Sequence, residues 1–351
     1  LERHAARLDL GRYARSVAGV QGSRRLRVAV IGAGLSGLTA ARILDDQGHD
    51  VVVVDKGQKP GGRMSTRRSD LGSFDHGAQY FTARDPRFLR HVLAWRERGL
   101  VEAWEGRIAV VDEDGIGQDK GSSERYVAVP GMSAICAELA QELPDCRLSW
   151  QVSQVGREAG QWVLSSDKGD QLTADALVVA IPAPQAASLL EGSEIANRVA
   201  AVEMRPCWAV MAVFDRPLLR EHDAAFVNHG PLSWLAGQAS RPGRPGVEGW
   251  VLHAGPEWSQ EHLEDDPAEV RNQLLKAALE LPIAQAASVE NAVAHRWRYA
   301  LARTPLEAGV VWVEDQRLAI AGDWCHGSRV EGAFLSGAAA AGRIMASATR
   351  E

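Results

Sequence analysis

The sequence has few cysteines, and none of them has a metal-binding spacing. Cys136, Cys146, Cys207 and Cys325 are the four cysteines among 351 residues, and no two form a CxxC motif. A zinc site or a disulfide framework is therefore not expected. Reduced thiols in a cytoplasmic protein are the simpler interpretation, and we predict no metal.

Long apolar runs and an excess of basic residues are also missing. The apolar segments are interrupted by Gly or Pro, whereas a membrane-spanning helix needs about 20 apolar residues. The formal net charge is -6, whereas nucleic-acid-binding proteins usually carry a basic excess. We expect neither a membrane nor a nucleic acid as partner. With 46% hydrophobic residues, the chain is long enough for two interleaved globular domains.

Residues 1–25 contain no motif that we recognise. Six arginines lie between residues 3 and 25, opposed only by Glu2 and Asp9. No apolar segment follows them, so a secretory signal is not expected. We interpret residues 1–25 as an N-terminal extension outside the fold, and an arginine-rich transit peptide is the alternative.

A strand–helix–strand unit between residues 26 and 55 is the strongest local pattern. The apolar run 26–31 predicts a buried parallel strand, residues 35–47 predict a helix that ends at Gly48, and residues 51–54 predict a second buried strand. The motif Gly32-Ala33-Gly34-Leu35-Ser36-Gly37 lies between the first strand and the helix, and Asp55 ends the second strand. In this context GxGxxG indicates dinucleotide binding.

Each residue type in this motif has a physical role. Gly32 permits a tight turn, Gly34 lets the backbone approach a pyrophosphate, and Gly37 lets the helix and the strand pack closely. The helix N-terminus offers N–H groups and a positive dipole end to phosphates. Asp55 is placed to accept hydrogen bonds from ribose hydroxyls, and its charge disfavours a 2′-phosphate there. A purely structural glycine turn is the alternative.

Two further segments indicate FAD rather than NAD. Gly61-Gly62-Arg63 follows the ribose acid, and Arg63 is suited to charge-assisted hydrogen bonds with the pyrophosphate. Near the C-terminus, Asp323 follows a predicted strand at 317–321 and is suited to hold a ribityl hydroxyl. A helix predicted from Gly332 to about residue 347 directs its positive end toward the same space, which favours an anionic reduced flavin.

Longer segments resemble the bacterial renalase-like branch of the flavin amine oxidase superfamily. They are GGRMSTRR (61–68), FDHGAQYFTARDPRF (74–88), AIPAPQAASLL (180–190), HRWRYA (295–300) and GDWCHGSRVEGAFLSG (322–337). The resemblance extends from about residue 26 to the end of the chain. It implies a noncovalent FAD and an oxidase of the 1,2- and 1,6-dihydro isomers of NAD(P)H. Such an enzyme returns NAD(P)+ and passes the electrons to oxygen, giving hydrogen peroxide.

The same resemblance implies two sets of binding residues. Besides Gly32, Gly34 and Gly37, those expected to bind FAD are Leu35, Asp55, Lys56, Arg63, Gln79, Tyr80, Val152, Asp323 and Val330. Those expected to line the substrate site are Tyr80, Phe81, Thr82, Ala83, Arg84, Trp208, Arg329 and His295. A dihydronicotinamide already carries a transferable hydride, so we predict no catalytic side chain.

Some of these assignments have structural alternatives. Arg84 is equally suited to an ion pair with Asp85 or another acid, Trp208 to packing in a core, and His295 to a structural role. Two other functions also stay open. A true amine oxidase needs an aromatic cage beside the flavin, and we find no convincing aromatic pair that flanks the C-terminal motif, where Trp324 follows Gly322-Asp323. The second open function is that of a protein that binds FAD but catalyses no reaction.

The expected fold class is α/β, with a Rossmann-type FAD-binding domain and a mixed-sheet substrate domain. We assign residues 26–90, 131–184 and 316–351 to the FAD-binding domain. The substrate domain comprises residues 91–130 and 185–315. A helix is expected at 130–143, and antiparallel strands are expected between residues 148 and 173. The expected partners are a small-molecule substrate and oxygen.

Overall fold

The structure is a computed structural model that describes residues 24–70, 72–119, 121, 123–244 and 249–349. The N-terminal extension expected at residues 1–25 lies outside the described residues, except for Arg24 and Arg25. Among the described residues, we find no helix with the length and hydropathy that a membrane span requires.

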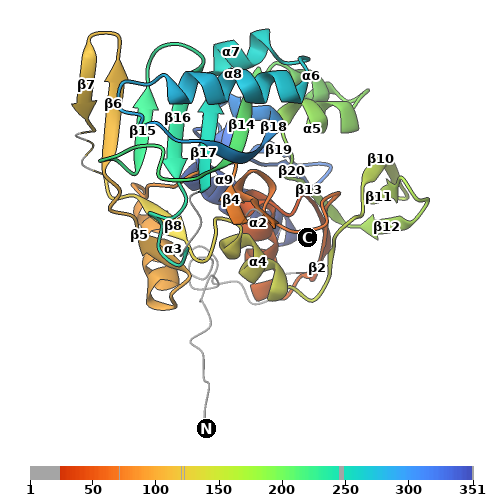
Figure 1. Cartoon of the computed structure of the whole chain (residues 1–351). Coiled ribbons are helices and arrows are strands. Elements are labelled where there is room, and N and C mark those ends of the chain that lie inside the picture. The colour runs from red at the N-terminus through yellow and green to blue at the C-terminus, as the bar shows by residue number, and fades with distance from the viewer. Residues whose placement is uncertain (1–23, 71, 120, 122, 245–248, 350–351) are drawn as a thin grey trace.

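A six-stranded sheet forms the half of the chain that contains the glycine motif (Figure 1). Its order is β19 (Val311–Val313), β20 (Leu318–Ile320), β13 (Ala176–Val179), β1 (Arg27–Ile31), β2 (Asp50–Val54) and β9 (Cys146–Arg147). Strands β20, β13, β1, β2 and β9 are parallel, and β19 is antiparallel at one edge. These strands are apolar on both sides because the sheet is covered on both faces.

The two faces of this sheet have different covers. Val28 and Val30 of β1 face a core shared with α2 (Leu35–Asp46), α4 (Ala134–Gln141) and α9 (Val330–Ala348). Ala29 and Ile31 face the opposite core, which contains residues of the antiparallel sheet β10 (Val152–Glu158), β11 (Gln161–Ser166) and β12 (Gln171–Ala174). Helices α5 (Ala183–Leu189) and α6 (Glu194–Ala200) complete that second core.

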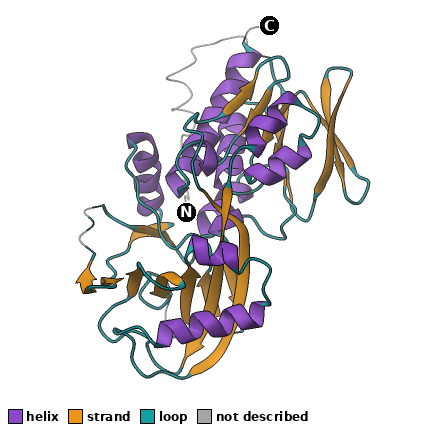
Figure 2. Cartoon of the chain, turned by 90° about the horizontal axis from the view of Figure 1, so that it is seen from above, coloured by secondary structure: helices purple, strands orange, loops and turns teal. Residues whose placement is uncertain are grey.

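A seven-stranded sheet forms the other half of the chain. Its order is β18 (Val289–Ala302), β14 (Met204–Phe214), β17 (Gly249–Ala254), β16 (Leu232–Gly237), β15 (Ala224–Val227), β6 (Ile108–Asp112) and β7 (Gly115–Gln118). The β15–β6 pair is parallel and the other pairs are antiparallel. Helices α7 (Pro256–Glu261) and α8 (Pro267–Leu279) cross one face (Figure 2). The expected α/β class, with a Rossmann fold and a mixed sheet, is confirmed.

Short elements join the two sheets. They are the hairpin β3 (Thr66–Ser69) and β4 (Gly72–Asp75), the pair β5 (Val101–Ala103) and β8 (Tyr126–Ala128), helix α3 (Pro86–Glu97), and the 3-10 turns η1 (Gly62–Met64) and η2 (Asp323–Cys325). We keep the domain bounds expected from the sequence as a proposal. Strand β19 pairs within the six-stranded sheet, although it lies just before residue 316, where the last segment of the expected FAD-binding domain begins.

Helix α4 begins four residues later than the sequence predicts. The backbone N–H of Met132 donates to Asp75 Oδ1 at 3.0 Å, and that of Ser133 donates to Thr66 Oγ1 at 3.1 Å. These side chains bind the N–H groups before the helix begins at Ala134. A tertiary contact that sequence periodicity does not encode therefore sets the start of α4.

Candidate functional site

The glycine turn after β1 has the shape that a bound diphosphate needs. Gly32 has a φ of 111°, and a Cβ there would lie 2.5 Å from the carbonyl oxygen of Ala180. A Cβ on Gly37 would lie at less than 3.0 Å from the carbonyl oxygen of Gly32. At Gly34 a Cβ would have no atom within 4 Å, so this backbone faces open space. Helix α2 begins at Leu35 with no acidic side chain in its first turn, which suits an anion.

Asp55 lies beside the same turn, at the end of β2. Its Oδ2 accepts a hydrogen bond from Ala33 N at 2.7 Å, and its Oδ1 accepts one from Gly57 N at 2.6 Å. Each carboxylate oxygen keeps a lone pair with which it can accept a hydrogen bond from a ribose hydroxyl. Lys56 is exposed, and Val152, at the start of β10, is half-buried against the second core.

Arg63 and Asp323 bring the N-terminal and C-terminal motifs together. Arg63 Nη2 lies 2.6 Å from Asp323 Oδ1, and Nη1 lies 3.1 Å from Oδ2. Arg63 Nη1 also donates to the carbonyl oxygen of Ala300 at 3.0 Å. The loop that carries Arg63 rests on the glycine turn, because Gly61 N donates to Ala33 O at 2.9 Å. The sequence assigned Arg63 to the pyrophosphate, and the structure places its guanidinium on Asp323.

These observations fit the FAD expected from the sequence. An open backbone at Gly34, an uncapped helix N-terminus and the carboxylate of Asp55 are the groups that an adenosine diphosphate requires. Asp323 is linked to the loop after β2 through Arg63, and Val330 is the first residue of α9.

The segment from Gln79 to Asp85 contacts the first turn of α9. Glu331 Oε1 accepts hydrogen bonds from Arg84 N at 2.6 Å and from Asp85 N at 2.7 Å. The Asp85 carboxylate forms its ion pair with Arg87, at 2.7 Å, and not with Arg84. The side chains of Arg84 and of Arg329, the N-cap of α9, are exposed. The segment with Arg84 and the helix start with Arg329 therefore lie next to each other. Both carry residues that the sequence assigned to the substrate site.

Two expected substrate-site residues have buried side chains. The ring of Phe81 stacks on Tyr126, with 5.8 Å between ring centroids, and is 3% exposed. Trp208 is 1% exposed, and its indole N–H donates to the carbonyl oxygen of His262 at 2.9 Å. Trp208 packs on the face of β14 that α8 covers. His295 lies on the opposite face, because its register partner is the next residue, Ala209.

His295 belongs to a group of rings that the sequence did not predict, in which His76 is buried and His253, His295 and Trp297 are half-buried. The His76 ring lies 4.8 Å from the His295 ring and 4.9 Å from the Trp297 ring, measured between centroids. Trp297 Nε1 donates to the carbonyl oxygen of His76 at 2.9 Å, and His253 Nε2 lies 3.0 Å from the same oxygen. Only the register of β17 and β18 brings these rings together.

The surroundings of this group favour the neutral form of all three imidazoles. Burial, with the nearby His295 and Arg67, lowers the pKa of His76 to about 3. Burial lowers the pKa of His253 to about 4. Burial, with Arg67, also lowers the pKa of His295. The group therefore places polar side chains with little charge beside the segment that begins at Gly77.

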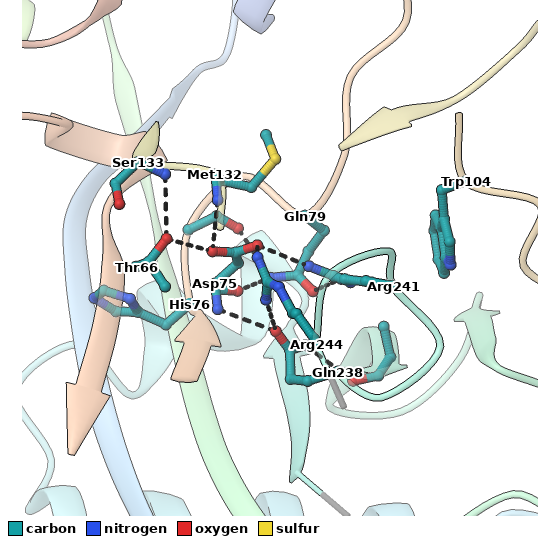
Figure 3. Close-up of polar contacts among 12 residues, drawn as sticks. Thr66, Asp75, His76, Gln79, Trp104, Met132, Ser133, Gln238, Arg241 and Arg244 are labelled. Atoms are coloured by element: carbon teal, nitrogen blue, oxygen red, sulfur yellow. Dashed lines mark hydrogen bonds and ion pairs between the residues drawn. The ribbon is translucent and has the colours of Figure 1, made fainter. Parts of the chain in front are cut away.

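Asp75 is the centre of a second unexpected group, shown in Figure 3. Its Oδ1 accepts hydrogen bonds from Thr66 Oγ1 at 2.6 Å and from Met132 N at 3.0 Å. Its Oδ2 contacts the guanidinium groups of Arg241, at 3.2 Å, and of Arg244. The sequence indicated only a Pro/Gly-rich interruption at residues 241–249, so the burial of these arginines was not predictable.

Aromatic side chains surround Tyr80. The ring of Tyr80 lies 6.0 Å from Trp104 and 5.6 Å from Trp234, between centroids, and the guanidinium of Arg125 lies 5.2 Å from its centre. Trp324, the aromatic residue considered for an amine cage, is fully buried and donates to the carbonyl oxygen of Ile181 at 3.1 Å.

Solved structures with similar folds cover nearly the whole chain. One is a putative protoporphyrinogen oxidase from Exiguobacterium sp. 255-15, with a TM-score of 0.76 and 13% identity over 93% of this chain and 100% of that chain. Another is cyclohexylamine oxidase from Brevibacterium oxydans IH-35A, with a TM-score of 0.75 and 15% identity over 92% of this chain and 99% of that chain. At these identities the likeness shows the fold alone.

Curated relatives match only a short part of the chain. A hydroxyneurosporene desaturase of Rubrivivax gelatinosus is 46% identical over 61 residues, which is 17% of this chain and 12% of the relative. An L-amino acid oxidase of Cerastes cerastes is 46% identical over 50 residues, which is 14% of this chain and 10% of the relative.

Two family models match in succession. Residues 30–94 match the NAD(P)-binding Rossmann-like domain, and residues 104–345, well over half of the chain, match the flavin containing amine oxidoreductases. The FAD expected from the sequence, and the oxidoreductase class, are confirmed at the level of this family. The chain belongs to the flavin containing amine oxidoreductase family.

Proposed function

We propose that the protein is an FAD-dependent oxidase of dihydro-NAD(P) isomers, in the manner of the renalase-like branch that its motifs resemble. The supporting observation is the contact of Glu331 with Arg84 and Asp85. Glu331 belongs to the motif at 322–337, and Arg84 and Asp85 belong to the motif at 74–88. The two most specific segments of the sequence therefore meet at one point.

The residues proposed to bind FAD are those expected from the sequence. Bound FAD supplies the acceptor for a hydride. The open backbone of Gly34 and the N-terminus of α2 suit the diphosphate, Asp55 suits the adenosine ribose, and Gln79 and Tyr80 suit the ring system. Burial raises the pKa of the Cys325 thiol to about 12, which keeps it protonated and supports noncovalent binding.

The substrate site that we propose comprises Tyr80, Thr82, Ala83, Arg84 and Arg329, with His295 at its edge. Two exposed arginines suit the diphosphate of a dinucleotide. A neutral imidazole group suits a reaction whose product is a cationic nicotinamide ring, since protonated histidines would repel that ring. We leave the buried Phe81 and Trp208 out of this site.

Amine oxidation is the second candidate function. The observation that favours it is the aromatic group of Tyr80, Trp104 and Trp234, because aromatic faces attract an alkylammonium ion and pack against its neutral form. A dinucleotide substrate needs the exposed arginines, whereas a small amine does not.

Anaerobic stopped-flow reduction of the bound FAD separates these functions. The donors are NAD isomers made by borohydride reduction, ordinary NADH, and a panel of amines that includes cyclohexylamine. We expect loss of the oxidised flavin absorbance with the NAD isomers and far slower loss with NADH. Reduction by amines alone would establish the second candidate. Reduction by none of these donors would favour an FAD-binding protein without turnover.

A further inference from the structure

Three buried side chains form what we call the Asp75 cluster: Asp75, Arg241 and Arg244. The side chains of Asp75 and Arg241 are fully buried, and that of Arg244 is 6% exposed. Asp75 ends β4, beside the Rossmann half, whereas both arginines follow β16 of the large sheet. The cluster therefore joins the two halves of the chain at a point without access to solvent.

The charges in the Asp75 cluster do not cancel. Among the described residues, Asp75 is the one carboxylate within ion-pair distance of either guanidinium. Burial and the neighbouring Arg244 lower the pKa of Arg241 to about 10, with Asp75 opposing them. Arg241 therefore stays protonated at pH 7. One carboxylate and two guanidinium groups leave a net charge of about +1 in a buried site, where charges act over longer distances than in water.

Arg241 connects this charge to the segment proposed to bind the flavin. Its Nη2 donates to Gln79 Oε1 at 2.6 Å, while its Nη1 holds Asp75. The Gln79 amide group in turn donates to the carbonyl oxygens of Asp75 and Gly77. The Arg241 guanidinium also lies 5.4 Å from the centre of the Trp104 ring, which packs on Tyr80. The Arg241 side chain therefore holds Gln79 by a hydrogen bond and supports Tyr80 through the ring of Trp104.

We propose that Arg241 is a positioning residue of the flavin site, and that the net positive charge of the Asp75 cluster raises the reduction potential of the bound FAD. Two electrons and one proton convert FAD to its anionic reduced form, and a buried cation stabilises that anion relative to the neutral oxidised form. This inference rests on the proposed contacts of Gln79 and Tyr80 with FAD. The identity of the substrate does not enter it.

The test is the midpoint potential of bound FAD, measured in equilibrium with a reference dye and a chemical reductant. Arg241→Met and Arg244→Met each remove one positive charge, so both should lower the potential. Asp75→Asn removes the negative charge and should raise it. Arg216→Gln is the control, because the Arg216 side chain is 58% exposed on the loop after β14. The midpoint potential of FAD bound to this variant should equal that of the wild type.

A structural role alone gives a different pattern. If the cluster only holds the fold together, the Met and Asn variants would lower thermal stability without moving the potential in opposite directions, and the proposal would be overturned. Arg241→Lys provides a second criterion if Asp75→Asn does not fold. Its ammonium keeps the charge but lacks the planar fork that holds Asp75 and Gln79 together. We expect a near-wild-type potential with FAD affinity weakened several-fold.

Equal potentials for Arg241→Lys and Arg241→Met would refute the electrostatic effect. Unchanged FAD affinity and an unchanged flavin absorption spectrum in Arg241→Lys would refute the positioning role. Because the potential is measured without substrate, a failure of dihydro-NAD isomers to reduce wild-type FAD would refute the proposed function and leave the order of potentials intact.

Discussion

Arg63 and Asp323 are 260 residues apart in the sequence, and they form a two-point ion pair that closes the proposed flavin site. The Asp323 side chain is 9% exposed and that of Arg63 is 28% exposed. Loss of either partner leaves a charge in a largely buried place. The pair also holds the turn after β20 against the loop after β2.

We expect Arg63→Ala to weaken both FAD binding and the fold. Removing a guanidinium that makes three hydrogen bonds should lower the free energy of unfolding by about 1–3 kcal/mol. Arg63→Lys keeps the charge but not the two-point geometry, so its loss should be smaller. Urea unfolding and FAD titration give the two quantities. Equal stability for the wild type and Arg63→Ala would contradict the structural role of the pair.

Gly34 and Gly37 should respond differently to alanine. A Cβ on Gly34 meets no protein atom, and the φ of Gly34 is -83°, so the apoprotein should fold normally. FAD affinity should fall at least about tenfold, because the Cβ would enter the space proposed for the diphosphate. A Cβ on Gly37 would overlap the Gly32 carbonyl, and the overpacking should cost about 1–3 kcal/mol of stability. Thermal unfolding of both apoproteins, with FAD titration, checks the contrast.

Glu331→Ala should impair turnover more than FAD binding. Two backbone N–H groups, of Arg84 and Asp85, would lose a charged acceptor, which is worth about 1.5–3 kcal/mol per hydrogen bond in favourable cases. Glu331→Gln keeps an acceptor oxygen and should recover much of kcat/KM. Steady-state kinetics with the NAD isomers and FAD titration provide the comparison. A Gln variant as impaired as the Ala variant would argue that the charge of Glu331, and not its acceptor oxygen, is required.

Arg329→Ala should raise the substrate Kd and leave flavin reoxidation unchanged. Arg329 is exposed and is proposed to bind the substrate diphosphate, so its loss should weaken binding about tenfold. Reoxidation by oxygen involves no contact with this side chain in the proposed site. Stopped-flow measurement of both half-reactions tests the assignment, and an unchanged substrate Kd would exclude Arg329 from the site.

The buried imidazoles should make stability depend on pH. The pKa of His76 is lowered from 6.5 to about 3, and that of His253 to about 4. The unfolded chain therefore binds more protons than the folded chain between about pH 6.5 and 4, so stability falls as the pH falls through this window. Each histidine contributes up to about 1.4 kcal/mol per pH unit below 6.5.

Replacement of one imidazole checks this dependence. Urea unfolding at pH 7 and at pH 5 should show a smaller difference for His76→Gln than for the wild type. His222→Gln is a suitable control, because His222 lies outside the group of rings around His76. An identical pH dependence in wild type and His76→Gln would mean that His76 does not carry the effect.

The sequence was sufficient to predict the nucleotide-binding half of the fold. The run at 26–31, the glycine motif and Asp55 are local patterns whose geometry is set within about thirty residues. Gly322-Asp323 was also predictable, because a short motif follows a buried strand. The proximity of Arg63 to Asp323 was implied by one cofactor contacting both, whereas their direct ion pair was not.

The buried polar groups were not predictable, because they depend on long-range register. His253 and His295 become neighbours only when β17 and β18 both pair with β14. The position of Trp208 follows from the same register, and alternation along β14 turns it toward α8. Arg241 and Arg244 follow Gln238 in a Pro/Gly-rich segment, where charged residues are usually solvated. Their burial depends on distant partners, above all Asp75 on β4, together with Gln79 for Arg241 and the carbonyl oxygen of Pro130 for Arg244.

The packing of the last helix on the first has a consequence for biosynthesis. Gly337 of α9 lies directly against the backbone of Ser36 in α2, and β20 fills a position inside the six-stranded sheet. A ribosome-bound chain therefore lacks part of its nucleotide-binding sheet until residues 318–348 emerge from the exit tunnel. Until then the apolar face of α2 that packs on α9 stays uncovered, and apolar surface that is transiently exposed during folding favours aggregation.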